Sequence, residues 1–372
     1  MKFLIIKFGI FLINIFYSFI KGLPVKKRVV FISRQSNKES EDIILLKKEL
    51  KKKNKDLEIV TLCKKLESGL KSKITYLFHM FLQMYYLATS KVIILDRYCI
   101  CASILKKKKG TVIIQMWHAL GAFKKFGCSI LDQEEGSSSK LAGVMKMHSN
   151  YDYILTSSEE TKKYFGQAFN NSLDNIIVMP LPRVDKLTDK KYKDKIKENI
   201  FEKYPQLMKK KNIVYVPTFR KGKEDVKPIN DLIEQIDFSK YNLIIKLHPL
   251  SKIKITDARV LIDKKFSSID MMMISNYVIT DYSAIVFEAA ILNKPIFFYC
   301  YDLDKYYRKR NFYIDYKKEM PGLISGEAKD IVFAIENKNY DLATIKKFQN
   351  KYVDYQKNKC TSNFVDFIVK YL

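Results

Sequence analysis

The feature that most constrains the fold of this chain is the alternation of short β-branched apolar runs with segments of helical periodicity. The apolar run Val29–Ser33 is followed by helical periodicity over Glu41–Lys53 and then by a second apolar run at Glu58–Leu62. Strands that alternate with helices in this way predict a parallel sheet that is covered by helices on both faces. The expected fold class is therefore α/β.

The alternation occurs twice along the 372 residues, which suits two domains. The expected strands of the first series continue with Val92–Leu95, Thr111–Met116, Tyr151–Leu155 and Asn175–Met179, and an aromatic-rich helix is expected over Lys73–Ala88. The expected strands of the second series are Asn212–Val216, Leu243–Leu247, Tyr277–Thr280 and Ile296–Tyr299, with helices over Asn230–Ile236 and Ala284–Leu292. Two such domains can face a cleft at the carboxyl ends of their strands, where open α/β folds bind ligands.

These patterns divide the chain into five segments. We predict an apolar helix over 1–24, an N-terminal Rossmann-like α/β domain over 25–186 and a Lys-rich crossover over 187–211. A C-terminal Rossmann-like α/β domain over 212–350 and a final helix over 351–372 complete the chain.

The first segment is almost entirely apolar from Phe3 to Ile20, but it lacks the small-residue cleavage site of a signal peptide. Its length is marginal for a spanning helix, and Lys7 counts against that interpretation. Two interpretations remain open. The segment lies in or on a membrane that attracts its lysines, or it packs on the fold before the first strand.

The chain carries a formal net charge of +27, from 67 Lys and Arg against 40 Asp and Glu. Such a balance suits nucleic acid, an anionic membrane or a polyanionic substrate. The lysine runs at 51–53, 106–109 and 209–211 lack interleaved aromatic residues, and no zinc-finger spacing accompanies them. We therefore expect no nucleic-acid partner, and many of these lysines are typical of solvated helix ends and loops.

The sequence calls for no cofactor. The six cysteines form no CxxC pair, which predicts a reducing compartment without structural zinc or a disulfide framework. The sequence contains no Walker A motif, no Gly-rich dinucleotide fingerprint and no nucleophile elbow. Positive side chains and a helix dipole can neutralise phosphates instead, so the expected metal requirement is also none.

The first polar cluster follows the apolar run Thr111–Met116. Trp117, the only tryptophan, and His118 come directly after it, and Lys124 and Lys125 follow shortly. A histidine at the end of a strand can act as a general base near neutral pH. The alternative is a core histidine with one hydrogen-bonded nitrogen.

Two further clusters close expected strands of the second domain. Thr218 and Arg220 form a hydroxyl and guanidinium pair, and Arg makes bidentate contacts with phosphate. Lys246 and His248 lie two residues apart, on one side of a strand that ends at Pro249, and would form a cationic wall. The alternatives are a basic loop and a solvated strand end.

A fourth cluster opens the helix expected over Ala284–Leu292. Its members are Thr280, Asp281, Tyr282 and Ser283. Asp281 or Ser283 can cap the helix, whose free N–H groups then form an anion site, although an ordinary helix cap explains the same pattern. Glu288 can take ribose hydroxyls or be a solvated helix position.

A fifth cluster is the tyrosine- and cation-rich stretch Tyr306–Tyr316. It is expected to form a loop near the cleft. Its Arg310 is a candidate phosphate ligand, with a solvated arginine as the alternative.

In their order along the chain, these clusters resemble the motifs of the CDP-glycerol glycerophosphotransferase family, the teichoic-acid primases and polymerases. The resemblance runs from Trp117 to Gly322. The matching motifs are Trp117-His118, Pro182-Arg183-Val184-Asp185, Pro217 to Arg220, Lys246 to Pro249, Thr280 to Ser283, Lys294 to Tyr299 and Phe312 to Gly322. Departures from the family pattern are Ala119, Leu181, Ala284 and Asn311.

The resemblance implies a GT-B-like fold and an enzyme at the cytoplasmic face of the bacterial cell membrane, held peripherally or as a monotopic protein. It implies CDP-glycerol or CDP-ribitol as donor and a lipid-linked acceptor. The domain at 25–186 would serve the acceptor side, with Trp117, Lys124 and Lys125. The domain at 212–350 would bind the donor.

The expected reaction is transfer of an alditol phosphate with release of CMP, with His118 and His248 as catalytic residues. His118 would take the proton of the acceptor hydroxyl, and His248, Arg220 and Ser283 would stabilise developing charge. The remaining donor-binding candidates are Thr218, Lys246, Thr280, Asp281, Tyr282, Glu288 and Arg310. The alternatives are a GT-B glycosyltransferase that uses a nucleotide sugar and a non-catalytic basic membrane-binding protein.

Overall fold

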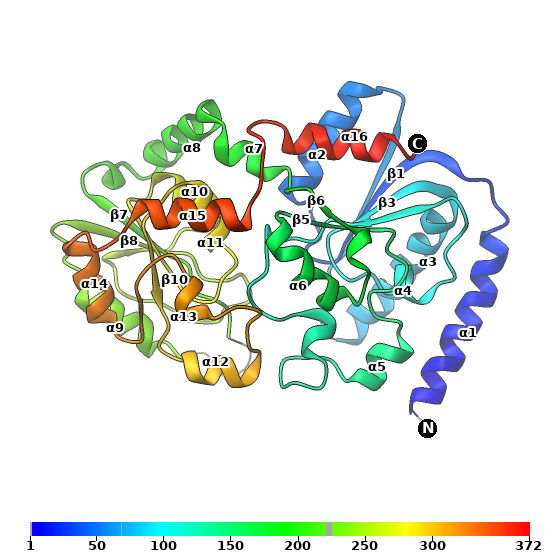
Figure 1. The fold of residues 1–372 in the computed structure, drawn as a ribbon, viewed down its shortest axis with the longest axis horizontal. Helices are drawn as coiled ribbons and strands as arrows, with labels where there is room; N and C mark the ends of the chain where they lie inside the picture. The colour runs from blue at the N-terminus through cyan, green and yellow to red at the C-terminus, as the bar shows by residue number, and fades with distance from the viewer. Residues whose placement is uncertain (1, 68, 221–224) are drawn as a thin grey trace. The chain divides into compact units, whose positions relative to one another are not determined.

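The computed structural model describes residues 2–67, 69–220 and 225–372. The chain forms two compact units (Figure 1). The first contains Met1–Arg183 together with Tyr355–Leu372, and the second contains Val184–Asp354.

The first unit is built on a six-stranded parallel sheet with the order β2-β1-β3-β4-β5-β6. Its strands are β1 (Lys26–Ser33), β2 (Glu58–Cys63), β3 (Ser90–Leu95), β4 (Val112–Gln115), β5 (Tyr153–Thr156) and β6 (Ile176–Val178). Its helices are α1 (Lys2–Ile20), α2 (Glu41–Lys53), α3 (Leu70–Thr89), α4 (Ile100–Ile104), α5 (Ser139–Val144), α6 (Glu159–Phe169) and α16 (Cys360–Val369).

Local sequence explains why these elements form where they do. In β1, the four consecutive residues Val29–Ile32 are all buried, as expected of a central strand that is covered on both faces. In α2, the Ser40 side chain caps the helix by accepting a hydrogen bond from the N–H of Ile43. Acidic residues in the first turn and lysines in the last turn of α2 complement the helix dipole.

The second unit is built on another six-stranded parallel sheet, with the order β12-β11-β10-β7-β8-β9. Its strands are β7 (Lys211–Tyr215), β8 (Tyr241–Ile245), β9 (Val260–Leu261), β10 (Tyr277–Thr280), β11 (Ile296–Tyr299) and β12 (Ile324–Ser325). Its helices are α8 (Lys190–Lys203), α9 (Lys227–Gln235), α10 (Ser268–Ile274), α11 (Val286–Ile291), α12 (Leu303–Lys309), α13 (Tyr316–Glu319), α14 (Ala328–Glu336) and α15 (Leu342–Tyr352). Helix α7 (Arg183–Thr188) begins at the boundary between the two units.

These two sheets confirm the predicted α/β class. Each sheet has one point at which the strand order reverses, between β1 and β3 in the first unit and between β7 and β10 in the second. Open α/β sheets bind ligands outside the carboxyl ends of the strands at such a switch point. The residues that follow these four strands are therefore the first place to look for a site.

Two segments that the sequence-based division sets apart from the domains are grouped with the two units by their contacts. The contacts group 187–211, which we expected as a crossover, with the second unit, where α8 packs on α10 and buries Ile200. The final helix α16 packs on α2 of the first unit, so the last 18 residues return to the first sheet (Figure 1).

Candidate functional site

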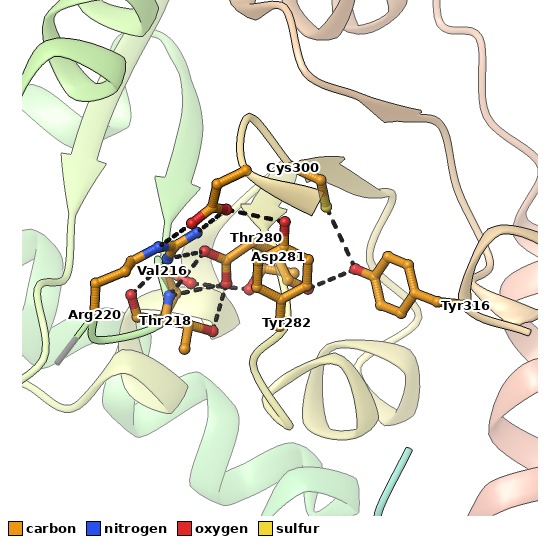
Figure 2. A network of polar contacts seen from close by, with 9 residues as sticks. Val216, Thr218, Arg220, Thr280, Asp281, Tyr282, Cys300 and Tyr316 are labelled. Carbon is orange, nitrogen blue, oxygen red and sulfur yellow. Dashed lines mark hydrogen bonds and ion pairs between the residues drawn. The ribbon is translucent and has the colours of Figure 1, made fainter. Parts of the chain in front are cut away.

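The switch point of the second sheet is occupied by a polar network that joins the ends of β7 and β10 (Figure 2). The fully buried carboxylate of Asp281 accepts hydrogen bonds from the Thr218 N–H at 2.8 Å and the Thr218 hydroxyl at 2.6 Å. The Arg220 guanidinium forms an ion pair with the same carboxylate. Three of the predicted donor-binding residues therefore lie together as expected.

Arg220 is held on a second side by Asp302, which follows β11. Its Nε and Nη2 donate to the two carboxylate oxygens of Asp302 at 3.1 and 2.9 Å, and its Nη1 donates to the Thr218 carbonyl at 2.6 Å. Burial lowers the pKa of Arg220, but Asp281 and Asp302 outweigh burial and raise the pKa above its ordinary value. The loop cation is thus permanently charged and is held by two carboxylates in one orientation.

The remaining members of this network tie it to the sheet. Thr280 donates its hydroxyl hydrogen to the Val216 carbonyl at 2.8 Å, and Tyr282 donates to Asp302 at 3.0 Å. The Tyr316 hydroxyl donates to the Asp281 carbonyl at 2.8 Å (Figure 2). Thr280 and Tyr282 are fully buried. They hold the loops together and do not make the direct contacts with a donor that we predicted.

His248 lies at the edge of a cavity of about 220 Å³ beside this network. Its exposed ring stacks on Phe219, with ring centroids 5.2 Å apart. The His248 Nδ1 accepts a hydrogen bond from the Leu250 N–H at 3.1 Å. An accepting Nδ1 carries no proton, so the proton of the neutral ring is on Nε2, and this nitrogen is a hydrogen-bond donor.

Lys246 has a structural role in place of the predicted contact with the donor. Its ammonium is buried and donates to the Asp263 carbonyl at 2.7 Å, the Asp263 carboxylate at 2.9 Å and the Phe266 carbonyl at 2.6 Å. An ammonium group has three N–H donors, and these contacts use all of them. The two-residue spacing of Lys246 and His248 predicted a cationic wall, but of this pair Lys246 is buried and His248 is exposed.

The other three donor-binding candidates lie outside the network of Figure 2. Ser283 is half-buried in the turn before α11, and its hydroxyl oxygen accepts the Ile285 N–H at 3.4 Å. Because Asp281 bonds Thr218 and Arg220 instead, it does not cap this helix, which begins at Val286. Glu288 is buried within α11, so it is not the solvated helix position that we weighed as its alternative.

Arg310 is half-buried and follows α12 directly. Its N–H donates to the Tyr306 carbonyl at 3.1 Å and so closes this helix. The expectation of a loop over Tyr306–Tyr316 is wrong at its beginning, because Tyr306 to Lys309 belong to α12.

The first unit places His118 at the carboxyl end of β4. Its Nδ1 is 3.4 Å from the main-chain carbonyl oxygen of Asp96, which follows the neighbouring strand β3. A carbonyl oxygen only accepts, so Nδ1 carries the proton and Nε2 holds the free electron pair of the neutral ring. Burial lowers the pKa of His118 well below its ordinary value, and the cations of Arg97, Arg183 and Lys124 lower it further.

The main chain is bent sharply just before this histidine. Trp117 has a φ of 59°, a left-handed conformation that is rare for a bulky residue. Its N–H donates to the Gln115 side chain at 3.0 Å, and its ring stacks on Phe126 with centroids 4.9 Å apart. Strained backbone of this kind collects at functional sites.

Lys124 and Lys125 are half-buried in the loop after β4. Lys124 is close enough to His118 to lower the pKa of its ring. Trp117 and Lys124 therefore both lie close to His118.

Comparison with known proteins decides the family. The model of the CDP-Glycerol:Poly(glycerophosphate) glycerophosphotransferase family matches residues 15–370. The chain belongs to this family. In Bacillus spizizenii, a teichoic acid ribitol-phosphate primase is 33% identical over 94% of this chain and 93% of its own length. In Bacillus subtilis, a teichoic acid glycerol-phosphate primase is 32% identical over 78% of this chain and 76% of its own length.

The fold is shared with solved structures. The wall teichoic acid polymerase TagF, soaked with CDPG, superposes with a TM-score of 0.75 over 93% of this chain and 89% of that chain, at 21% identity. The likeness covers both units and supports the GT-B-like class. Among the described residues of this family member, no group of three or more His, Cys, Asp or Glu side chains is placed to hold a metal ion.

Sequence reasoning missed several site residues. Asp302 holds Arg220, and Asp42 forms an ion pair with Arg183, whose Nη2 donates to the His118 carbonyl at 2.9 Å. Asp96 supplies the carbonyl that contacts His118. Asp96 and Asp302 both lie shortly after expected strands. A search of the strand ends for aspartates as well as for cations would have identified them.

Proposed function

We propose that this chain transfers an alditol phosphate from CDP-glycerol or CDP-ribitol to a lipid-linked or polymer acceptor, in the synthesis of teichoic acid or a related cell-surface polymer. The observation that carries the proposal is the opposite proton placement in two histidines of the motif set. His118 offers an electron pair at Nε2, and His248 offers a hydrogen at Nε2. A general base for the hydroxyl and a hydrogen-bond donor for the developing charge both accelerate phosphoryl transfer to an alcohol.

His118 is the general base of this proposal. A base must be unprotonated when the acceptor hydroxyl arrives, and the lowered pKa of His118 keeps its ring neutral at pH 7. The contact of Nδ1 with the Asp96 carbonyl fixes the tautomer and the ring orientation. The acceptor oxygen forms a bond to the distal phosphorus of the donor, and its proton passes to Nε2 of His118.

His248 stabilises the charge that develops as the phosphoanhydride bond breaks and CMP leaves. Its Nε2–H donates to a phosphoryl oxygen, and the Leu250 N–H holds the ring in the required tautomer. Arg220 lines the same cavity, where Asp281 and Asp302 hold its guanidinium in one orientation beside the bound phosphates. No step of this mechanism needs a metal ion.

The donor is tested by measuring CMP release. Wild-type protein with a lipid-linked acceptor is expected to release CMP from CDP-glycerol or CDP-ribitol, and not UDP or GDP from nucleotide sugars. Release should persist in EDTA, because the proposed mechanism uses hydrogen-bond donors of the protein and no metal ion. UDP or GDP release in place of CMP would support a glycosyltransferase, and liposome binding without any nucleotide release would support a non-catalytic membrane protein.

We further propose that the protein lies on the cytoplasmic face of the membrane through α1 and α3. Helix α1 contains an 18-residue segment, Phe3–Ile20, that is long and apolar enough to cross a bilayer and has only 6% of its residues buried. The Asn14 side chain donates to the Ile104 carbonyl at 3.0 Å and accepts from the Lys106 N–H at 2.9 Å, and Tyr17 is buried. These contacts tie α1 along the first unit, which supports a helix that lies on the membrane.

Helix α3 extends the apolar surface of α1. Phe16 of α1 packs edge to face on Phe81 of α3, with ring centroids 5.6 Å apart. The large apolar side chains that α3 exposes are Leu70, Ile74, Leu77, Phe78, Phe81 and Leu82. A continuous exposed apolar surface of two helices in a chain with a net charge of +27 fits an anionic bilayer.

A pair of matched substitutions tests this membrane surface. Phe78→Glu on α3 is expected to weaken binding to phosphatidylglycerol vesicles by about tenfold or more, because a buried Phe contributes about 1.5–3 kcal/mol. Phe333→Glu on α14 is the control, because its side chain is 66% exposed against 68% for Phe78. Equal loss in both variants, measured by vesicle flotation, would contradict a surface confined to α1 and α3.

A further inference from the structure

The carboxyl group of Asp96 is buried in the first unit. Asp96 follows β3 at the switch point of the sheet and is only 2% exposed. Neither carboxyl oxygen has a hydrogen-bond partner of acceptable geometry among the described residues, although the Ser33 hydroxyl is near enough to affect its pKa. A buried carboxyl without a partner is costly, so its presence calls for a functional reason.

The main chain of the same residue already contacts the proposed base. Leu95 and Gln115 are register partners in the parallel pair of β3 and β4, so the residues that follow the two strands are neighbours. The carbonyl oxygen of Asp96 is 3.4 Å from Nδ1 of His118. The unpartnered carboxyl therefore belongs to the residue that orients the imidazole.

The charged groups around His118 and Asp96 overlap at Arg97. The cations that lower the pKa of His118 come from three segments, namely Arg97 after β3, Lys124 after β4 and Arg183 at the start of α7. The groups that shift the pKa of Asp96 are Ser33, Arg97 and Asp42. The groups that Asp96 itself shifts are Cys63 at the end of β2, Arg97 and the buried Cys99. Asp42 forms an ion pair with Arg183, whereas the carboxyl oxygens of Asp96 have no hydrogen-bond partner among the described residues.

We propose that Asp96 is a positioning residue for His118, which orients Nδ1–H with its carbonyl and supplies with its carboxylate the negative charge that stabilises the imidazolium. The proposal rests on the proposed function, in which His118 takes the proton of the acceptor hydroxyl. The imidazolium exists only after that transfer, so the carboxylate acts on the transition state more than on substrate binding.

The ionisation of Asp96 gives the reaction a pH dependence. Burial raises the pKa of Asp96 to about 6, against the opposing effects of Ser33 and Arg97. Above this pH the carboxylate is charged and stabilises the imidazolium, and below it the stabilisation is lost. The kcat of the wild type should therefore fall as the pH decreases through about 6, while His118 itself stays neutral to a lower pH.

The variant Asp96→Asn keeps the carbonyl contact and the shape of the side chain but removes the charge. We expect kcat to fall about tenfold at pH 7.5, the equivalent of about one pKa unit of stabilisation, with KM for the CDP-alditol unchanged. The decline near pH 6 should disappear from its pH profile. The melting temperature at pH 7.5 should be unchanged or higher, because an unpaired buried charge is removed.

The matched control is Asp152→Asn. Asp152 pairs with Lys107 and comes just before β5, at the amino ends of the strands, whereas His118 lies at their carboxyl ends. The substitution therefore makes the same change in net charge away from His118. Its pH profile should keep the decline near pH 6.

A second readout needs no turnover. In protein with labelled histidines, whose His118 signal is identified by its loss in His118→Asn, the NMR titration should show a lower pKa for His118 in Asp96→Asn than in the wild type.

The outcomes separate the two proposals. No CMP release by the wild type, with a lower His118 pKa in Asp96→Asn, would overturn the proposed function and keep the electrostatic link. Normal release by the wild type, with an unchanged His118 pKa and an unchanged pH profile in Asp96→Asn, would overturn only the role of Asp96.

Discussion

His118→Asn is expected to reduce CMP release by about a hundred- to ten-thousandfold, the range that a general base typically contributes. The asparagine amide still donates to the Asp96 carbonyl, so the local contact survives while the electron pair at Nε2 is lost. The measurement is single-turnover CMP release with saturating CDP-alditol and acceptor. Thermal melting and CDP-alditol affinity should stay near the wild-type values, because His118 acts on the acceptor.

His248→Asn provides the contrast. It removes the donor that faces the phosphates, so the affinity for the CDP-alditol should weaken together with kcat, whereas His118→Asn changes kcat alone. If folded His118→Asn turned over like the wild type, the assignment of the base would be wrong. If the two variants exchanged these patterns, the roles of the two histidines would be reversed.

Asp281→Ala is expected to lower the free energy of unfolding of the second unit by about 3–5 kcal/mol, the usual effect of breaking a buried ion pair. The fully buried Asp281 carboxylate satisfies the N–H and hydroxyl of Thr218 and pairs with Arg220 (Figure 2). Its removal leaves a buried donor unpaired and part of a guanidinium uncompensated. The expected shift in the thermal transition is on the order of 10 °C.

Asp257→Asn is the matched control for this prediction. Asp257 also pairs with an arginine of the second unit, but Arg259 and Asp257 are both accessible to solvent. Exposed pairs contribute about 0–1 kcal/mol, so the control should melt near the wild-type temperature. A loss below about 1 kcal/mol in Asp281→Ala would show that this network does not hold the loops of β7 and β10 together.

The fold was largely predictable because the strands are central and buried on both faces. The predicted runs at Val92–Leu95, Tyr277–Thr280 and Ile296–Tyr299 match β3, β10 and β11 to within two residues, since each is a continuous apolar segment. The two-residue strands β9 and β12 were missed because their pairing depends on neighbours distant in the sequence. The short length of α11 was also missed, because Ser283 forms a turn of its own before the helix begins.

The position of the site could be predicted, but the hydrogen-bond and ion-pair partners of its residues could not. Following the strands to their carboxyl ends located Thr218, Arg220 and Asp281 correctly in one place. Which of these side chains bond one another depends on segments 60 or more residues apart, such as the 63 residues between Thr218 and Asp281. The ion pair of Lys246 with Asp263 could not be predicted for a different reason, because the loop that carries Asp263 shows no pattern of its own.

The return of α16 to the first unit has a consequence for biosynthesis. Its apolar side chains Phe364, Val365 and Ile368 are buried, and Asp366 pairs with Lys53 of α2. A ribosome delivers these residues only after the whole of Val184–Asp354 has been made. The side of α2 that α16 covers therefore stays exposed while the second unit is synthesised. A nascent chain stalled before Tyr355 would present this surface to chaperones.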